Sequence, residues 1–276
     1  MPPNKNMNEQ KLLSLLYSGQ AENIELAQEL AKGLKVDLKT ALKRRGLAKW
    51  GLDTPKKFVD LKKLNLQDQQ IVQFPTEVCK IVCLEILQIS MNKIAILPNE
   101  IGELIHLKEL YLDNNQLTEI PVAVAKLQKL EILNLAHNKI RLLPATFGLL
   151  RQLRRLSLNK NRLSLLPDSF RNLQNIVSLS LAENVFEQFP NVLCELKNIE
   201  RLYFQHNYLP ILPPELGDCT QLQTLNLGHN VLKTLPNTVN KCKFLVDLNL
   251  EDNPVFDTER DKINKLLPFA NIFYRF

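Results

Sequence analysis

Apolar residues recur along most of this chain with a period of 23 residues. Each period contains the pattern Leu-x-x-Leu-x-Leu-x-x-Asn-x-Leu, in which the alternation of leucine and variable residues predicts a short strand. One unit cannot bury its leucines alone, so the pattern predicts a coil in which successive units stack. Nine units keep this register without insertion or deletion, and they begin at Leu61, Leu84, Leu107, Leu130, Leu153, Ile176, Ile199, Leu222 and Leu245.

An asparagine follows the strand pattern in eight of the nine units, and Gln69 takes its place in the first. An inward amide can donate to and accept from backbone groups that would otherwise be buried without partners where the strand turns away. We expect Gln69 to do this less well, as suits a terminal unit. The predicted structural ladder consists of Asn92, Asn115, Asn138, Asn161, Asn184, Asn207, Asn230 and Asn253.

Prolines occupy another repeated position. The chain has 15 prolines and only 8 glycines. Proline fixes φ and lacks an N–H, so it favours an extended corner between the strand side and the outer side of the coil. The prolines at this corner are Pro75, Pro98, Pro121, Pro144, Pro167, Pro190, Pro213 and Pro236.

The 23-residue unit with Leu-Pro in its second half resembles the leucine-rich repeat family, in particular the intracellular subclass found in Ras-suppressor proteins and many bacterial proteins. The resemblance covers residues 61–276. It implies an α/β solenoid, a right-handed horseshoe with a parallel β-sheet on its concave face, where partners usually bind. Such motifs are specific for the fold and say little about function.

The two ends of a stacked core must be covered, and the sequence predicts a cap at each. Residues 1–60 lack the repeat and are expected to form helices at 9–17, 22–34 and about 38–47, with a further helix start at Thr54-Pro55. The apolar face for covering the first repeat is assigned to Leu12, Leu13, Leu15, Leu16, Ile24, Leu26, Leu30 and Trp50.

Residues 254–276 form the predicted C-terminal cap, after nine repeats over 61–253. A helix is expected at 258–267 and a last strand at 271–276. This tail and the helical segment before the repeats are similar to those of bacterial members of the family, including Bacteroidetes proteins.

The variable residues of the strand pattern should point out of the concave face, because side chains alternate along a strand. Interfaces are enriched in tyrosine and arginine. Tyr-Leu and Glu-Ile-Leu are also common fillings of these positions in the family, so the same residues fit an ordinary repeat surface. The candidate contact set, in which the apolar members are expected to be exposed, is Ile86, Met91, Tyr111, Ile132, Arg154, Arg155, Arg201, Tyr203 and His206.

Two histidines are candidates for a metal site, and two cysteines are candidates for a disulfide. His206 and His229 should stand one strand spacing apart, about 5 Å, close enough to share a metal. Carboxylates or thiols that would complete a zinc site are not evident, so both are interpreted as surface histidines and no metal is assigned. Cys219 and Cys242 should stack in the core, where a disulfide is conceivable and buried thiols are favoured.

Charge is uneven along the chain. Residues 1–60 carry eleven Lys and Arg against seven Asp and Glu, a net +4 out of the total of +6. The run led by Lys43, Arg44, Arg45, Lys56 and Lys57 could meet an acidic protein, an anionic membrane or nucleic acid, or it could be a solvated helix surface. The concave face has mixed charge, which disfavours nucleic acid. Its basic island is Arg151, Arg154, Arg155, Lys160 and Arg162, and its acidic end is Asp247, Glu251 and Asp252.

No GxGxxG, Walker, HExxH or GxSxG motif occurs, and the repeats leave few positions for an active site. We therefore expect a non-catalytic scaffold, without cofactor, that binds a protein or peptide on the concave face. The alternative is a peripheral membrane or acidic-partner anchor acting through the basic N-terminal cap. The polar start, the lack of a long apolar run and the odd number of cysteines, five, favour a cytoplasmic protein; a monomer is expected.

Overall fold

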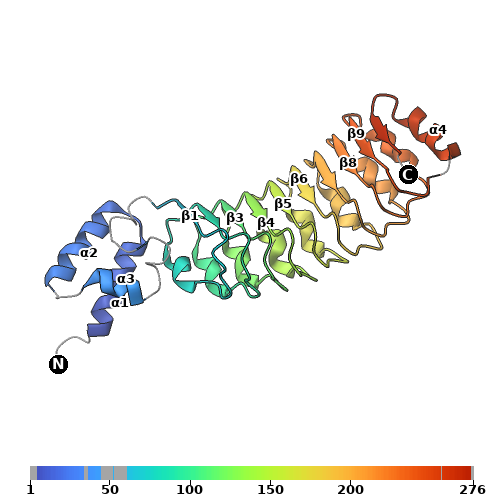
Figure 1. The fold of residues 1–276 in the computed structure, drawn as a ribbon. Coiled ribbons are helices and arrows are strands. Elements are labelled where there is room, and N and C mark those ends of the chain that lie inside the picture. Colours follow the sequence, from blue (N-terminus) through green and yellow to red (C-terminus); the bar gives the residue numbers. More distant parts are fainter. Residues whose placement is uncertain (1–4, 34–36, 45–51, 53–60, 256, 275–276) are drawn as a thin grey trace.

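The computed structural model describes residues 5–33, 37–44, 52, 61–255 and 257–274. The chain forms an elongated solenoid with helices α1 to α3 at one end and helix α4 at the other (Figure 1). Strands follow one side of the solenoid, and short helices follow the opposite side (Figure 1). This is the predicted leucine-rich repeat architecture.

Ten parallel strands form one sheet in sequence order. Each strand is three residues long, and the central residue of the first nine is a buried leucine between two more exposed side chains. The strands are β1 (Lys63–Asn65), β2 (Ile86–Gln88), β3 (Glu109–Tyr111), β4 (Ile132–Asn134), β5 (Arg155–Ser157), β6 (Ser178–Ser180), β7 (Arg201–Tyr203), β8 (Thr224–Asn226), β9 (Asp247–Asn249) and β10 (Asn271–Phe273).

The second half of each repeat forms a 3-10 helix of five residues that begins directly after the repeated proline. These prolines have φ between −65° and −77° and an extended ψ, so they turn the chain without continuing the strand. The helices are η3 (Thr76–Lys80), η4 (Asn99–Glu103), η5 (Val122–Lys126), η6 (Ala145–Leu149), η7 (Asp168–Asn172), η8 (Asn191–Glu195), η9 (Pro214–Asp218) and η10 (Asn237–Lys241).

The core is one continuous column of apolar side chains between the sheet and the 3-10 helices. Phe147 and Phe170 occupy the same position in neighbouring repeats, and their rings stack with centroids 6.1 Å apart. Each repeat therefore completes the core of the one before it, so a rigid backbone supports the outward side chains.

The N-terminal helices are α1 (Lys5–Tyr17), α2 (Ala21–Gly33) and α3 (Leu38–Arg44). The Tyr17 hydroxyl donates to Glu77 Oε2 at 3.0 Å, which ties α1 to the first repeat. The sequence-based assignment of α2 was wrong for two residues: Leu26 and Leu30 are 45% and 43% exposed. The helix instead buries residues with helical spacing on its other side, namely Ile24, Ala27 and Ala31. Trp50 and the Thr54-Pro55 signal lie outside the described residues.

At the other end, α4 (Asp257–Leu266) precedes β10, which pairs in parallel with β9. Ile263 and Leu267 are buried against the last repeat. Within the described ranges, none of the helices has the length and apolar character needed to cross a membrane.

Candidate interaction surface

The asparagine ladder lies beneath the edge of the sheet, and its members are between 3% and 8% exposed. Asn161 shows the pattern: its Nδ2 donates to the carbonyls of Leu135 and Leu158 at 2.9 and 3.0 Å, and its Oδ1 accepts from the Ile140 N–H at 3.0 Å. Each amide thus joins two repeats. Gln69 is exposed, and its Nε2 donates to Gln67 O at 3.1 Å within its own turn.

The residue before each ladder position has a positive φ between 50° and 58°, although none is glycine. This left-handed conformation turns the chain sharply after the strand and directs one side chain per repeat outward beside the sheet. Ordinary side chains adopt it only at a cost in free energy. The residues in this column are Asp68, Met91, Asn114, His137, Lys160, Glu183, His206, His229 and Asp252.

The exposed face of the sheet, which we call the sheet face, carries two parallel columns of side chains. Strand pairing aligns the first residue of each strand with the first residue of the next, and the third with the third. The first column reads Lys63, Ile86, Glu109, Ile132, Arg155, Ser178, Arg201, Thr224 and Asp247; the second reads Asn65, Gln88, Tyr111, Asn134, Ser157, Ser180, Tyr203, Asn226 and Asn249.

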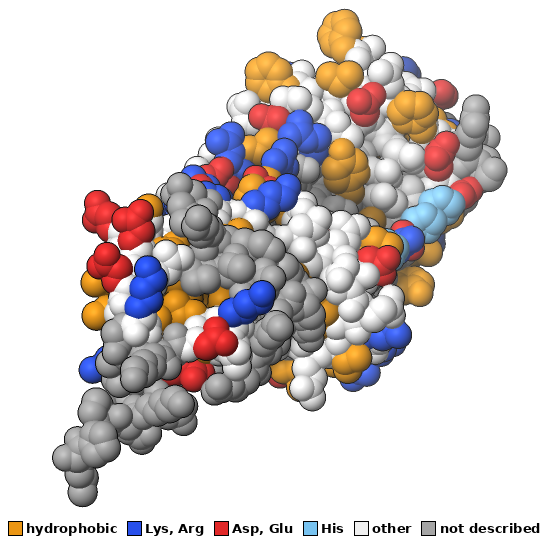
Figure 2. All heavy atoms as spheres, turned by 60° about the vertical axis from the view of Figure 1, so that its left-hand side comes forward, with side chains coloured by type: hydrophobic (Ala, Val, Ile, Leu, Met, Phe, Trp, Pro, Cys, Tyr) orange, Lys and Arg blue, Asp and Glu red, His pale blue; other side chains and the backbone are white. Residues whose placement is uncertain are grey.

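A hollow of about 300 Å³ lies over strands β3 to β7. A second hollow, of about 450 Å³, borders it along the entry side of the strands and shares Glu131, Arg154 and Val177 with it. Figure 2 shows Lys and Arg side chains gathered in one group on the solenoid, with Asp and Glu side chains beside them. The first hollow is lined by Glu109, Glu131, Ile132, Arg154, Arg155, Val177 and Arg201.

The arginines of the candidate set converge on this hollow from two strands. Arg154 and Arg155 are exposed and form no ion pair with a described residue. Arg201 is half-buried and pairs with Glu200 at 3.3 Å between Nη1 and Oε2. Two guanidinium groups are therefore available to a partner without loss of an internal ion pair.

Tyr111 and Tyr203 are half-buried in the second column. The Tyr111 hydroxyl donates to Glu109 Oε2 at 2.7 Å. Burial, together with this hydrogen bond and the negative charge of Glu109, raises the pKa of Tyr111 to about 12. Tyr111 therefore presents a neutral ring edge held in one orientation.

The apolar members of the candidate set differ from the expectation of full exposure. Met91 is 48% exposed, in the positive-φ column. Ile86 and Ile132 are only partly exposed. The exposed apolar contribution of this set therefore comes mainly from Met91.

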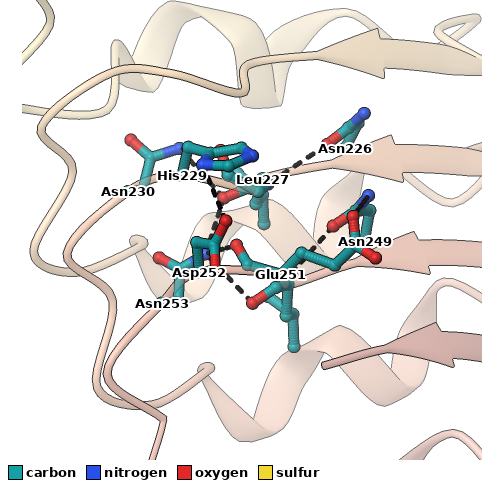
Figure 3. Close-up of polar contacts among 10 residues, drawn as sticks. Asn226, Leu227, His229, Asn230, Asn249, Glu251, Asp252 and Asn253 are labelled. Carbon is teal, nitrogen blue, oxygen red and sulfur yellow. Dashed lines mark hydrogen bonds and ion pairs between the residues drawn. The ribbon is translucent and has the colours of Figure 1, made fainter. Parts of the chain in front are cut away.

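His206 and His229 stack on each other, with ring centroids 3.9 Å apart and planes inclined by 10°. His229 Nδ1 lies 3.0 Å from Asp252 Oδ2, a carboxylate contact that the sequence analysis did not predict (Figure 3). Both residues occupy the same position in consecutive repeats, so an alignment of the repeats could have predicted this contact. Over the part of the chain that the structure describes, no cluster of three or more His, Cys, Asp and Glu side chains is suited to a metal.

All five cysteines are buried free thiols. Cys219 Sγ donates to Leu193 O at 3.6 Å, and Cys242 Sγ donates to Leu216 O at 3.7 Å. Burial raises the pKa of Cys242 to about 12. These thiols fill the core and do not contribute to the sheet face.

The basic N-terminal run lies for the most part outside what the structure describes: nothing is assigned to the side chains of Lys43, Arg44, Arg45, Lys56 and Lys57. In the first repeat, Lys62 pairs with Glu85 of the second repeat at 3.2 Å. Glu85 also pairs with Lys108 at 2.6 Å, and these hydrogen bonds lower its pKa.

Comparison with known proteins agrees with this architecture. Residues 99–208 match the family model described as a leucine-rich repeat region. This part of the chain is thus similar to that family, and the sheet of stacked parallel strands gives the chain the leucine-rich repeat fold. No curated protein matches the chain at a significant level.

Three solved structures share the fold. The ectodomain of the Arabidopsis thaliana receptor kinase GASSHO1/SCHENGEN3, in complex with CASPARIAN STRIP INTEGRITY FACTOR 2, is 29% identical over 69% of this chain and 27% of its own, with a TM-score of 0.61. The plant peptide hormone receptor RGFR1 in complex with RGF2 is 22% identical over 73% and 37%, with a TM-score of 0.60. The functional domain of InlJ from Listeria monocytogenes is 20% identical over 74% and 47%, with a TM-score of 0.54. This chain thus spans less than half the length of each.

Proposed function

We propose that this protein is a non-catalytic scaffold that binds a protein or peptide partner on its sheet face. The observation that carries the proposal is the hollow over β3 to β7, where the exposed Arg154 and Arg155 form no ion pair with a described residue. Two half-buried tyrosines stand in the second column of the same strands. Arginine and tyrosine, together with tryptophan, are enriched among the residues that contribute most to binding energy at interfaces.

The stacked repeats favour binding because the backbone is already ordered before the partner arrives. Every strand is hydrogen-bonded to its neighbours, and the ladder joins each turn to the next. A preorganised surface loses little conformational entropy on association, so more of the contact energy appears as affinity. The plant receptor ectodomain of similar fold is described in complex with CASPARIAN STRIP INTEGRITY FACTOR 2, which supports a binding role for this chain.

The test replaces four side chains together: Tyr111→Ala, Arg155→Ala, Arg201→Ala and Tyr203→Ala. The partner is first recovered from the native host by affinity capture and identified by mass spectrometry. We expect the quadruple variant to lose capture of that partner while it stays folded and still unfolds cooperatively, with a thermal unfolding temperature lowered by only a few degrees, because none of the four side chains belongs to the buried core.

The control removes one tyrosine and two arginines outside the sheet face, through Tyr208→Ala, Arg141→Ala and Arg171→Ala, all three of which are exposed. This variant should retain the partner. Capture that survives the quadruple variant, or that is lost equally in the control, would contradict a role for the sheet face.

A further inference from the structure

We infer that the partner is an extended segment that places one carboxylate between Arg155 and Arg201 and one basic side chain, about four residues away, over Asp247. This inference rests on the proposed function and specifies the chemistry of its ligand. It follows from the order of charges along the first column and from the spacing of the strands.

The charge of the side chains in the first column changes from positive to negative along the solenoid. Strand pairing places Arg155 beside Ser178, Ser178 beside Arg201, Arg201 beside Thr224 and Thr224 beside Asp247. The five side chains therefore form a straight row from basic to acidic. A ligand lying across the strands along this row meets a cationic site first and an anionic site later.

The cationic site has room at its centre. Ser178 is the small residue between the two arginines, and Ser180 stands beside it in the second column. Neighbouring strands lie about 4.8 Å apart, so the two arginine-bearing strands are separated by about 10 Å. That separation lets two guanidinium groups approach one carboxylate from opposite sides, above a serine hydroxyl that can also donate a hydrogen bond.

The mixed charge of the hollow favours a ligand group with a single negative charge. Arg154, Arg155 and Arg201 contribute three positive charges, Glu109 and Glu131 contribute two negative ones, and Glu200, which pairs with Arg201, contributes a third. A carboxylate can accept hydrogen bonds from the guanidinium groups with the least repulsion from these glutamates. A phosphate with nearly two negative charges would be repelled more strongly, and a polyanion more strongly still.

The anionic site lies at the other end of the row. Asp247 opens β9, and Glu251 and Asp252 follow that strand. The side chains of Asn249 and Glu251 are fixed near Asp252, since Asn249 Oδ1 accepts from the Glu251 N–H at 2.8 Å and Asn249 Nδ2 donates to Glu251 Oε2 at 3.2 Å (Figure 3). A lysine or arginine of the ligand can pair with these carboxylates.

The distance between the two sites sets the spacing in the ligand. From Ser178 on β6 to Asp247 on β9 there are three strand spacings, which amount to about 14 Å. An extended chain advances about 3.4 Å per residue, so about four residues cover this distance. The neutral second column between the sites, Tyr203, Asn226 and Asn249, can hydrogen-bond the amides of the ligand backbone.

The test uses fluorescein-labelled peptides built from alternating Ser and Gly, each with one Glu and one Lys separated by two, four or eight positions. Binding is measured by fluorescence polarisation at low ionic strength. We expect the peptide with a spacing of four to bind roughly tenfold more tightly than the other two and than its Glu-to-Gln version, because only that spacing engages both sites. Equal affinity for all three spacings would overturn the inference.

Protein variants assign the two sites separately. In the double variant Arg155→Gln and Arg201→Gln, the Glu and Gln peptides should bind equally, whereas Asp247→Asn should remove only the preference for Lys. Control variants Arg141→Gln with Arg162→Gln, and Asp218→Asn, change exposed charges outside the row and should leave both preferences intact. Unchanged preferences in the double variant would contradict the cationic site.

A further peptide carries phosphoserine in place of Glu. Tighter binding of the phosphoserine peptide would show that the site prefers phosphate and would overturn the assignment of a carboxylate. If all peptides fail while the quadruple alanine variant still loses the native partner, the proposed function stands and this description of the ligand is wrong. If that variant keeps the partner, the proposed function itself fails.

Discussion

The asparagine ladder and the first column of the sheet face run side by side along the solenoid, yet they differ in the variety of their residues. The ladder has the same residue in eight successive repeats, whereas the column changes from Arg155 to Ser178 to Arg201 to Thr224 to Asp247 over only five. The ladder amides are buried against backbone, and the column faces solvent. A position whose side chain must hydrogen-bond the buried backbone therefore keeps the same residue in each repeat. A position that faces solvent can differ from one repeat to the next.

The largest loss of stability is expected from a substitution in the asparagine ladder. Asn161→Ala should lower the free energy of unfolding by about 3 kcal/mol, because the Ile140 N–H loses its buried acceptor and the carbonyls of Leu135 and Leu158 each lose one of two donors. Urea unfolding followed by circular dichroism measures this change. Asn159→Ala, two residues earlier and only half-buried, is the matched control and should cost less than about 1 kcal/mol. Similar costs for both would remove the distinction between the ladder and the exposed surface.

A smaller effect is expected at Tyr111, which lies on the sheet face but is half-buried. Tyr111→Phe removes the hydrogen bond to Glu109 and should lower stability by about 1 kcal/mol at neutral pH. Because the pKa of Tyr111 is raised to about 12 in the folded protein, above the value of 10 for a free phenol, the folded state favours the neutral form. This stabilisation is complete below pH 10 and is lost as the pH rises toward 12.

Absorbance at 295 nm, followed between pH 9 and pH 13 by titration, tests the origin of that shift. In the wild-type curve both Tyr111 and Tyr274 should ionise near pH 12, and the Phe variant should lose one of these two contributions and keep that of Tyr274. A variant curve that loses an ordinary phenol, ionising near pH 10, would show that Tyr111 is not held by burial and Glu109.

In the positive-φ column, a substitution by glycine should raise the stability of the protein instead of lowering it. His137 has a φ of 53°, which glycine adopts without steric cost, so His137→Gly should raise stability by about 0.5 to 1 kcal/mol. Asn114→Gly is the control, since asparagine already tolerates this conformation and little change is expected. Differential scanning calorimetry measures the stability of both variants. A loss of stability in His137→Gly would argue against a strained turn.

The smallest effect on stability is expected in the first column. Arg155→Ala should change the free energy of unfolding by less than about 0.5 kcal/mol, since the exposed side chain forms no ion pair with a described residue. Chemical denaturation measures this value, and it should coincide with weaker capture of the native partner. A cost of more than 1 kcal/mol would mean that Arg155 contributes to the fold as well as to the proposed surface.

Sequence reasoning predicted the repeats well because their signal is repeated nine times. The strand register, the position of each ladder amide and the corner at each proline all follow from one 23-residue pattern. Outside the repeats there is only one copy of each signal. Leu26 and Leu30 were therefore assigned to the buried side of α2, although its buried side is defined by Ile24, Ala27 and Ala31.

The candidate surface was predicted only in part for the same reason. The alternation of the strand identified which side chains point outward, but pairing between them depends on side-chain conformation across repeats. The pairing of Arg201 with Glu200, the bond from Tyr111 to Glu109 and the contact of His229 with Asp252 became visible only in three dimensions.

The sequence alone determined that this chain stacks identical turns, because the period of its leucines, asparagines and prolines permits one way to bury them all. Only the tertiary structure decided where the stack is hollow and which charges there lack partners. That outcome depends on which side chains of neighbouring repeats are long enough to meet, and residues 23 positions apart become neighbours only when the coil is closed.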